Sequence, residues 1–424
     1  MDITLTPSCP TGRIKAISSK SAAHRILICA AFADKDTVVR CDNTNKDIEA
    51  TANCLCALGA QIRYQKPYFH VTPIRTPVSG ATLPCNESGS TLRFLLPIIP
   101  ALGVDARFSM AGRLPERPLS PLYEELVSHG AQLGKQGTNP LTSSGKLSGD
   151  VYTIRGDVSS QFISGLLFAL TFSGNGGQLI IEGKTESAPY IDMTVDALSL
   201  FGAAPTKTAN GYIISKNVSL RSPLTLDVEG DWSGAAFPLC MGAIGNGEVT
   251  VYGLKNDSHQ GDRAIVDILR RFGADVSESE GEFTVKGGKP LHGITVDATQ
   301  IPDMVPALAT VACVAEGVTT IYGASRLRLK ESDRLMTVRE VLTALGADVR
   351  ETDDGLIING VPRLSGGTTD SFNDHRIAMS AAVASAASNG NITVLGAQCA
   401  SKSYPDFWRD IGQYLGVKNC EKQA

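Results

Sequence analysis

The sequence predicts an α/β fold of two similar domains, each built from three copies of one unit of about 70 residues. Three observations predict it: glycines that end amphipathic stretches, apolar stretches rich in small residues at the same period, and short strand-like runs between them. The glycines are spaced 70 to 73 residues apart. They are Gly59, Gly130, Gly202, Gly273, Gly346 and Gly416.

Each of these glycines follows an amphipathic stretch and is usually followed by alanine and an apolar residue, as in 53–62 and 338–349. Glycine tolerates the left-handed conformation that commonly ends a helix. We therefore expect six helices that stop at these glycines, each followed by a strand.

A second marker repeats at the same period. Six apolar stretches rich in small residues each open with polar or charged residues, and their reference positions are 69 to 73 residues apart. We expect six helices buried inside the domains, with the glycine-ended helices outside. The reference positions are Ser21, Ser90, Ser160, Ser233, Asp303 and Asp374.

Strand-like runs lie between the helices, for example at 150–156, 177–183 and 247–253. Several of them alternate polar and apolar residues, which is typical of half-buried strands. The predicted order of each unit is therefore strand–helix–strand–helix–strand, with one more strand as an alternative. Because one such unit is marginal alone, three units in each of two domains is the economical arrangement.

Composition narrows the class of protein. The chain has 424 residues, of which 42% are hydrophobic and 19% charged, with a formal net charge of −4. This balance favours a globular protein and argues against a nucleic-acid partner. No apolar run approaches the roughly 20 residues that cross a bilayer. Ten cysteines without framework spacing indicate reduced thiols, so we expect a cytoplasmic protein. We also expect a monomer with no membrane contact.

The starts of the apolar helices carry more charge than capping requires. Capping needs only a residue such as serine or aspartate, and it remains an alternative for a single position such as Ser233. It does not explain Lys20, Arg25, Arg93 or Arg376. Because helix starts attract anions, we expect six starts that together hold phosphates and carboxylates between the two domains.

Three further segments add cations. The run 326–335 contains six charged residues, although such a run is often a solvated helix face. Arg117 precedes a proline, which can aim a guanidinium rigidly, and Lys402 is expected on a loop before Pro405.

These motifs resemble the 5-enolpyruvylshikimate-3-phosphate (EPSP) synthase family over essentially the whole chain. The resemblance implies two domains of three βαβαββ units around buried parallel helices, the enolpyruvyl transferase fold or inside-out α/β barrel. It implies a discontinuous domain, 1–19 plus 231–424, and an inserted domain, 20–230. The motifs are SKSAAHR, SGSTLRF, ERPLSPL, SSQF, PYIDMT, GDWSGAA, IPD, RLKESDR and DHRIAM.

The same resemblance implies transfer of the enolpyruvyl group of phosphoenolpyruvate to the 5-hydroxyl of shikimate 3-phosphate, with no metal and no cofactor. The shikimate 3-phosphate residues would be Lys20, Ser21, Arg25, Ser159, Ser160, Gln161, Ser187, Tyr190, Asp303 and Lys330. The phosphoenolpyruvate residues would be Lys20, Gly89, Ser90, Arg117, Gln161, Arg334, Arg376 and Lys402. Sensitivity to glyphosate is expected because Gly89 is present.

Three residues are candidates for proton transfer during addition and elimination. Asp303 would accept the hydroxyl proton, and Glu331 would protonate and deprotonate C3 of phosphoenolpyruvate. Lys20 would share that proton traffic or stabilise phosphate. The alternatives are an N-cap for Asp303 and an ion pair with Lys330 or Arg334 for Glu331.

The closest rival function is enolpyruvyl transfer to UDP-N-acetylglucosamine by a family with the same fold. In that family a loop cysteine near an arginine acts as the acid. Residues 111–120, the corresponding loop here, contain no cysteine. A binding protein without activity would be expected to lack Asp303, Glu331 or Lys402, and all three are present.

Overall fold

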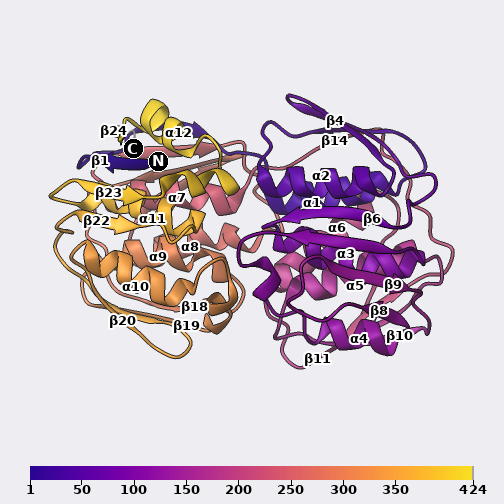
Figure 1. The fold of residues 1–424 in the computed structure, drawn as a ribbon. Coiled ribbons are helices and arrows are strands. Elements are labelled where there is room, and N and C mark those ends of the chain that lie inside the picture. Colours follow the sequence, from indigo (N-terminus) through magenta and orange to yellow (C-terminus); the bar gives the residue numbers. More distant parts are fainter. Residues whose placement is uncertain (423–424) are drawn as a thin grey trace. The chain divides into compact units, whose positions relative to one another are not determined.

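The computed structural model describes residues 1–422, which divide into two compact units (Figure 1). Unit 1 contains Met1–Ser19 and the chain from Glu229 onward, and unit 2 contains Lys20–Val228. The return crossing therefore lies two residues before the expected 230/231 boundary. Within residues 1–422, no helix is long and apolar enough to span a membrane.

Unit 2 contains three four-stranded sheets. Their strand orders are β14-β3-β5-β4 (Thr225–Asp227, Thr37–Arg40, Tyr68–Thr72, Gln61–Gln65), β6-β7-β9-β8 (Ala81–Asn86, Ala106–Met110, Leu141–Gly145, Ala131–Leu133) and β10-β11-β13-β12 (Val151–Arg155, Gly177–Glu182, Gly211–Ile214, Thr206–Thr208).

Unit 1 also contains three four-stranded sheets, with the last of them joining the two ends of the chain. Their strand orders are β16-β17-β15-β2 (Asp275–Ser279, Glu282–Lys286, Glu248–Tyr252, Gly12–Lys15), β18-β19-β21-β20 (Thr295–Asp297, Val318–Tyr322, Leu356–Asn359, Asp348–Glu351) and β22-β23-β1-β24 (Gly367–Asp370, Ile392–Leu395, Asp2–Leu5, Asn419–Lys422).

All six sheets share one pairing pattern, a parallel pair followed by antiparallel neighbours. In the repeat that begins with β6, the parallel partners β6 and β7 are joined through the helix α3, Gly89–Leu102. Two repeats complete their parallel pair across a chain crossing: β2 pairs with β15, and β14 pairs with β3. The expected extra strand is present, and each repeat is a βαβαββ unit.

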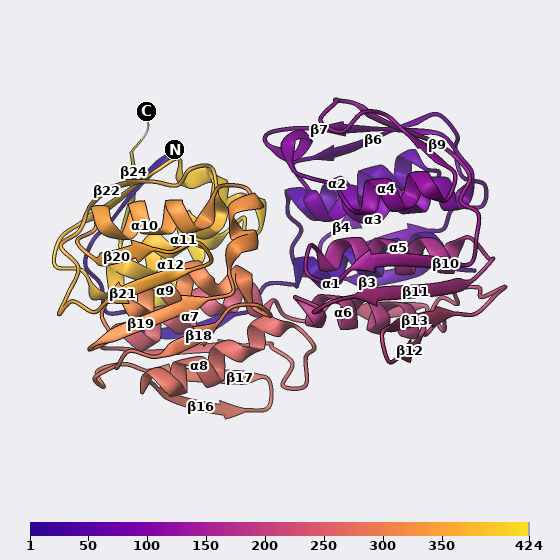
Figure 2. The same cartoon turned by 90° about the horizontal axis from the view of Figure 1, so that it is seen from below.

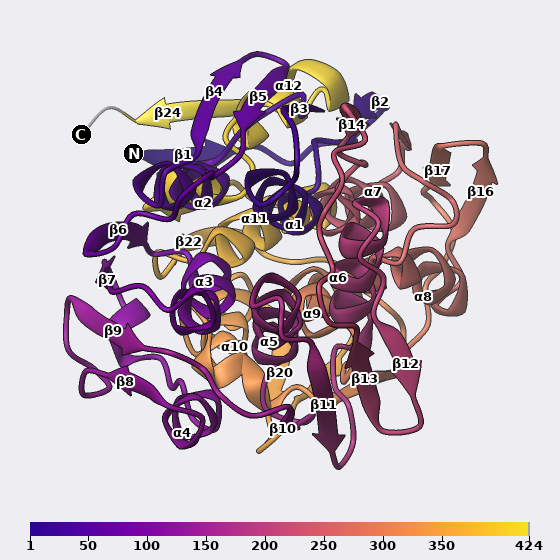
Figure 3. The same ribbon diagram turned by 90° about the vertical axis from the view of Figure 1, so that its right-hand side faces the viewer.

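The helices fall into an inner and an outer set. Figure 3 shows α1, α3 and α5 nearly end-on inside unit 2, surrounded by its sheets. In unit 1, α7, α9 and α11 contact one another in pairs (Figure 2). The inner helices are α1 (Lys20–Ala31), α3, α5 (Ser160–Phe172), α7 (Trp232–Ile244), α9 (Val305–Ala312) and α11 (His375–Ala384). The outer helices are α2 (Lys46–Ala57), α4 (Leu122–Ser128), α6 (Ala188–Leu200), α8 (Ile265–Phe272), α10 (Arg334–Ala344) and α12 (Phe407–Leu415).

The glycine marker is confirmed. All six glycines have φ between +69° and +113°, each just beyond the end of an outer helix. A side chain at φ in this range is strained, so the helix stops there without cost only at glycine.

A proline and a glycine allow the inner helices of unit 2 to approach closely. Pro97 inside α3 lacks the N–H that would bond to the Arg93 carbonyl. Gly165 of α5 faces that carbonyl, and a Cβ there would lie 2.4 Å from its oxygen. The small-residue composition of these helices therefore sets their spacing.

Candidate active site

The start of α1 holds two of the expected cations in different ways. Lys20 is the first residue of α1, and its Nζ lies 2.9 Å from Oδ2 of Asp47 on α2. Arg25 is 2% exposed and stacks over the Phe94 ring, with 4.9 Å between Cζ and the ring centroid. Lys20 therefore keeps a partly exposed ammonium, whereas Arg25 is embedded.

Arg25 is fixed by three hydrogen bonds to its own unit. Its guanidinium donates to Oγ1 of Thr194 at 2.8 Å and to the carbonyls of Ser21 and Tyr190 at 2.7 and 2.8 Å. Burial lowers the pKa of Arg25 to about 10, against the opposing effect of Tyr190. The contacts use three of five N–H groups, so the guanidinium is charged at neutral pH and rigidly oriented.

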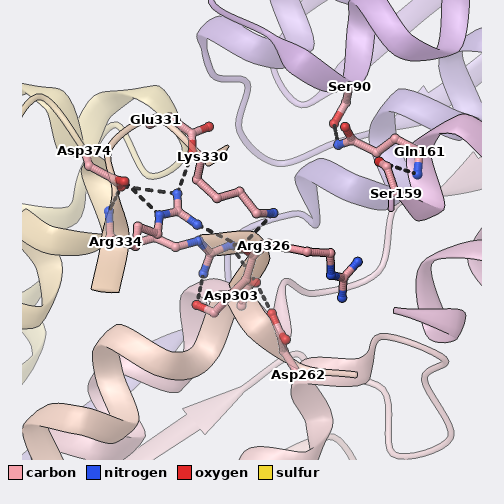
Figure 4. A network of polar contacts seen from close by, with 12 residues as sticks. Ser90, Ser159, Gln161, Asp262, Asp303, Arg326, Lys330, Glu331, Arg334 and Asp374 are labelled. Atoms are coloured by element: carbon pink, nitrogen blue, oxygen red, sulfur yellow. Dashed lines mark hydrogen bonds and ion pairs between the residues drawn. The ribbon is translucent and has the colours of Figure 1, made fainter. Parts of the chain in front are cut away.

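Gln161 links the starts of α3 and α5. Its Oε1 accepts from Arg93 at 3.1 Å, and its Nε2 donates to Oγ of Ser90 at 2.9 Å. The hydroxyl of Ser159 caps α5 by accepting from the Gln161 amide N–H, and Figure 4 shows Ser90, Ser159 and Gln161 together. Ser160 is buried beside them. The two helix starts thus share one network of polar groups.

Gly89, the first residue of α3, leaves room for two guanidinium groups. A Cβ at this position would lie 2.6 Å from Nη1 of Arg93 and 2.8 Å from Nη1 of Arg117. Arg117 follows the short 3₁₀ helix η1, Leu114–Glu116, and its side chain is half-buried. The absent side chain is therefore what lets both cations reach the start of α3.

Ser187 has a strained backbone at the start of α6. Its φ of 53° and ψ of 39° are left-handed, and the residue is 3% exposed. This conformation costs a non-glycine residue on the order of 1–3 kcal/mol and concentrates at functional sites. The next turn places the Tyr190 carbonyl against Arg25.

A buried chain of hydroxyl groups connects α1 to the cap of α3. Nδ1 of His24 lies 2.6 Å from Oγ1 of Thr51, which lies 2.7 Å from Oγ1 of Thr91. Thr91 donates to Oγ of Ser88, the N-cap of α3. Burial lowers the pKa of His24 to about 3, with Asp47 opposing this shift. The ring is therefore neutral at the pH of the cell.

The neutral His24 predicts a loss of stability in mild acid. The pKa is lower in the folded than in the unfolded chain, whose value is 6.5. Stability is therefore fully present above pH 6.5 and is lost as the pH falls toward 3. Between pH 7 and 5 this group contributes a loss of about 2 kcal/mol, measurable as a change in the urea-unfolding free energy.

The matched pair of variants is His24→Gln and His70→Gln. His70 lies in β5 of the same unit and is exposed, so its replacement is the control. His24→Gln should reduce the pH dependence by about 2 kcal/mol. Equal pH dependence in both variants would contradict a neutral buried His24.

In unit 1, Arg334 lies at the centre of a cluster of three carboxylates (Figure 4). It is 1% exposed and begins α10. Its nitrogens lie 2.8 Å from Oδ1 of Asp303, 2.7 Å from Oε2 of Glu331, and 2.7 and 3.2 Å from the two oxygens of Asp374. Burial alone would lower the pKa of Arg334, but the carboxylates, Asp374 foremost, outweigh it and raise the pKa above its usual value.

Asp303 has three cationic neighbours. Its carboxylate oxygens lie 2.8 Å from Arg334, 3.3 Å from Nζ of Lys330 and 3.5 Å from Arg376. Burial opposes ionisation of this carboxyl, but Arg376, Lys330 and Arg334 outweigh it and hold its pKa well below 3.8. The carboxylate is therefore ionised throughout the neutral range.

The remaining expected residues of unit 1 join the same cluster. Arg376 of α11 donates to the Asp303 carbonyl at 3.0 Å and to Oγ of Ser233 at 3.0 Å. Nζ of Lys402, 7% exposed, lies 3.7 Å from Oε1 of Glu331. The structure thus brings all the expected residues of unit 1 into one ion cluster.

Two sequence expectations differ from the structure. Asp303 does not cap a helix: it lies inside a 3₁₀ turn, Pro302–Met304, that precedes α9, and its carboxylate pairs with cations. Lys402 ends a 3₁₀ helix, Ala397–Lys402, rather than lying on a loop. Glu331 pairs with Arg334, one of its two suggested partners, and also with Lys402.

The run 326–335 is split between two environments. Arg328 pairs with Asp333 and Glu351 and is about a third exposed, as a solvated face would be. Arg334 is buried, and it pairs with Glu331 of the same run as well as with Asp303 and Asp374, which lie 31 and 40 residues away in sequence.

Several polar residues of these networks were missed by sequence reasoning. Asp374 was noted only as a repeat marker, although its place before two basic residues was a usable signal. Asp47 and Thr194 carried no local signal. Among residues 1–422, acidic, histidine and cysteine side chains form no group able to hold a metal ion.

The comparisons with known proteins agree with this architecture. A family model described as EPSP synthase (3-phosphoshikimate 1-carboxyvinyltransferase) matches residues 6–411. The 3-phosphoshikimate 1-carboxyvinyltransferase of Clostridium kluyveri is 40% identical over 96% of both chains. That of Clostridium acetobutylicum is 38% identical over 98% of this chain and 97% of its own.

Solved structures give the same result. The EPSP synthase of Acinetobacter baumannii superposes with a TM-score of 0.82 at 26% identity, covering 99% of this chain and all of that one. The enolpyruvyl transferase NikO of Streptomyces tendae, at 18% identity, shares the fold with a TM-score of 0.79 over 100% of this chain and 99% of its own.

Six βαβαββ repeats in two units define the enolpyruvyl transferase fold. Within that class, the family match covers nearly the whole chain and the curated relatives align end to end. The chain belongs to the EPSP synthase family.

Proposed function

We infer that the protein transfers the enolpyruvyl group of phosphoenolpyruvate to the 5-hydroxyl of shikimate 3-phosphate and releases phosphate, a step toward chorismate and the aromatic amino acids. The observation that carries this inference is the family match over residues 6–411. The cation-rich helix starts of both units support it, because both substrates are anions.

The shikimate 3-phosphate contacts are assigned mainly to unit 2. Ser159, whose oxygen already accepts from Gln161, has its hydroxyl proton available for a phosphate oxygen. Arg25 retains two N–H groups beyond its three contacts. The remaining assigned ligands are Lys20, Ser21, Ser160, Gln161, Ser187, Tyr190, Asp303 and Lys330.

The residues assigned to phosphoenolpyruvate include cations from each unit. Guanidinium groups match carboxylate and phosphate oxygens bidentately, and an ammonium supplies a compact charge. Arg334 is already held by three carboxylates, so it acts on the ligand with a fixed orientation. The assigned ligands are Lys20, Gly89, Ser90, Arg117, Gln161, Arg334, Arg376 and Lys402.

Asp303 is the proposed base for the attacking hydroxyl. Its low pKa makes it a weak base while Arg376 and Lys330 face it. An anionic substrate that binds these two cations would offset their charge and raise the pKa of Asp303 toward the range useful for proton transfer. Substrate binding would thus activate the base.

Glu331 is the proposed group for proton transfer at C3 of phosphoenolpyruvate. Its carboxylate lies between Arg334 and Lys402. Lys402 and Lys20 supply positive charge for the departing phosphate, and Lys20 shares the proton traffic.

Gly89→Ala is expected to weaken phosphoenolpyruvate and the inhibitor glyphosate. The new methyl group would displace the Arg93 or Arg117 guanidinium, and loss of a charged hydrogen bond costs about 1.5–3 kcal/mol. The KM for phosphoenolpyruvate should rise about 10- to 100-fold, whereas that for shikimate 3-phosphate should change far less. An unchanged KM for phosphoenolpyruvate would refute the placement of Gly89.

The decisive test of the acceptor is an assay of phosphate release from phosphoenolpyruvate. We expect release with shikimate 3-phosphate and none with UDP-N-acetylglucosamine. The reverse result would assign the protein to the rival reaction. We further propose that the enzyme is a cytoplasmic monomer that needs no metal or cofactor, which gel filtration and activity in the presence of chelator would check.

A further inference from the structure

Ser233 begins one of the six inner helices, yet no substrate contact is assigned to it. It is the second residue of α7, whose N-cap is Asp231 rather than Ser233 itself. Its hydroxyl is therefore not needed to cap the helix, and its contacts must be explained in another way.

The Ser233 hydroxyl connects a buried acid to a proposed ligand of phosphoenolpyruvate. Its Oγ accepts from Nη2 of Arg376 at 3.0 Å, and it donates to Oδ2 of Asp262. A hydroxyl has one proton. Because this proton is donated in the hydrogen bond to Asp262, the Ser233 oxygen can only accept from Arg376.

Asp262 is an unusual residue for its place. It lies in a short 3₁₀ turn, Gly261–Ala264, and is 2% exposed. Among the described residues its second oxygen, Oδ1, has no hydrogen-bond partner. A buried carboxyl with one unpaired oxygen is costly, and nothing in the geometry of the turn requires it. Its Oδ2 accepts a hydrogen bond from Ser233, which in turn accepts one from Arg376.

The charges of Arg376 and Asp303 both act on the pKa of Asp262. Burial raises the pKa of the Asp262 carboxyl; Arg376 opposes this shift, and Asp303 adds to it. Figure 4 shows Asp262 beside Asp303. Arg376 thus lies between two acids, held at Asp303 directly and at Asp262 through one hydroxyl.

We propose that Ser233 and Asp262 are positioning residues that hold the Arg376 guanidinium in the orientation that binds an anionic group of phosphoenolpyruvate. This proposal rests on the proposed function and on the assignment of Arg376 to that substrate. Neither residue touches substrate itself.

The test compares KM values for the two substrates in four variants. Ser233→Ala removes the acceptor of the Arg376 hydrogen bond and should raise the KM for phosphoenolpyruvate about tenfold. The KM for shikimate 3-phosphate should stay within about twofold. Asp262→Ala should act like Ser233→Ala, whereas Asp262→Asn keeps an acceptor oxygen for Ser233 and should restore nearly normal values. Ser380→Ala, which removes a buried hydroxyl from the same helix as Arg376, is the control and should change neither KM.

A double-mutant cycle then asks whether Ser233 acts through Arg376. In an Arg376→Lys background, Ser233→Ala should have less than about one third of its effect in the wild-type background, because coupled residues are not additive. An equal effect in both backgrounds, or an equal rise of both KM values, would overturn the proposal. If the wild-type enzyme releases no phosphate from this substrate pair, the proposed function fails first, and that failure is distinguishable.

Discussion

Asp303→Asn is expected to lower kcat by about 10²–10⁴-fold, the usual contribution of general acid–base catalysis. The amide cannot accept the proton of the attacking hydroxyl. It also removes the negative charge that Arg334, Lys330 and Arg376 share. Steady-state kinetics with both substrates saturating would measure the loss in kcat directly.

Asp333→Asn is the matched control for this prediction. Asp333 is an acid of the same unit that caps α10 and pairs with Arg328. Its side chain is 29% exposed. Because asparagine caps helices about as well as aspartate, activity should stay within about threefold. A kcat for Asp303→Asn within about threefold of the wild-type value would remove Asp303 from the proton-transfer chemistry.

Arg334→Leu is expected to destabilise the protein by about 3–5 kcal/mol, the cost of removing one partner from a buried ion pair. The buried Asp374 carboxylate and those of Asp303 and Glu331 would lose their shared cation. Activity should be lost as well. Urea unfolding at neutral pH would measure the change in free energy.

Two further variants separate buried from exposed charge. Arg409 also pairs with two carboxylates, Asp406 and Asp410, but its side chain is 60% exposed. Arg409→Leu should therefore cost less than about 1 kcal/mol. Adding Asp374→Asn to Arg334→Leu should recover part of the lost stability, because it removes one uncompensated charge. Equal costs for Arg334→Leu and Arg409→Leu would contradict the three-carboxylate cluster.

The fold was predictable from the sequence because each repeat has a glycine that ends its outer helix. Gly59, Gly273 and Gly416 each stop a helix, and their spacing alone implies six similar units. The strand-like runs, such as Val151–Arg155, carry a local alternation that any half-buried strand needs. These signals depend only on neighbouring residues, so they can be recognised in the sequence without knowledge of tertiary contacts.

The side-chain networks were not predictable in the same way. Arg334 pairs with Asp303 and Asp374, which lie 31 and 40 residues away in the sequence. A run of charged residues does not indicate which of its side chains is buried. Lys20 likewise finds Asp47 on the next helix. The family motifs located these cations, but only the packing of repeats decides which carboxylates hold them.

The elements that hold Asp303 and Lys402 differ from those expected and share one feature. Both lie in 3₁₀ turns beside a proline, Pro302 in one case and Pro405 shortly after the other. Proline removes a backbone N–H donor and disfavours the helical conformation at the residue before it. Short 3₁₀ turns leave little periodic signal in a sequence.

Nuclear magnetic resonance of phosphoenolpyruvate labelled with ¹³C at C2 tests the transfer itself. With shikimate 3-phosphate and the wild-type enzyme, the label should appear in an enolpyruvyl ether at the 5-oxygen, with one phosphate released for each ether formed. Label that remains in phosphoenolpyruvate, or that appears in pyruvate with no ether, would contradict enolpyruvyl transfer.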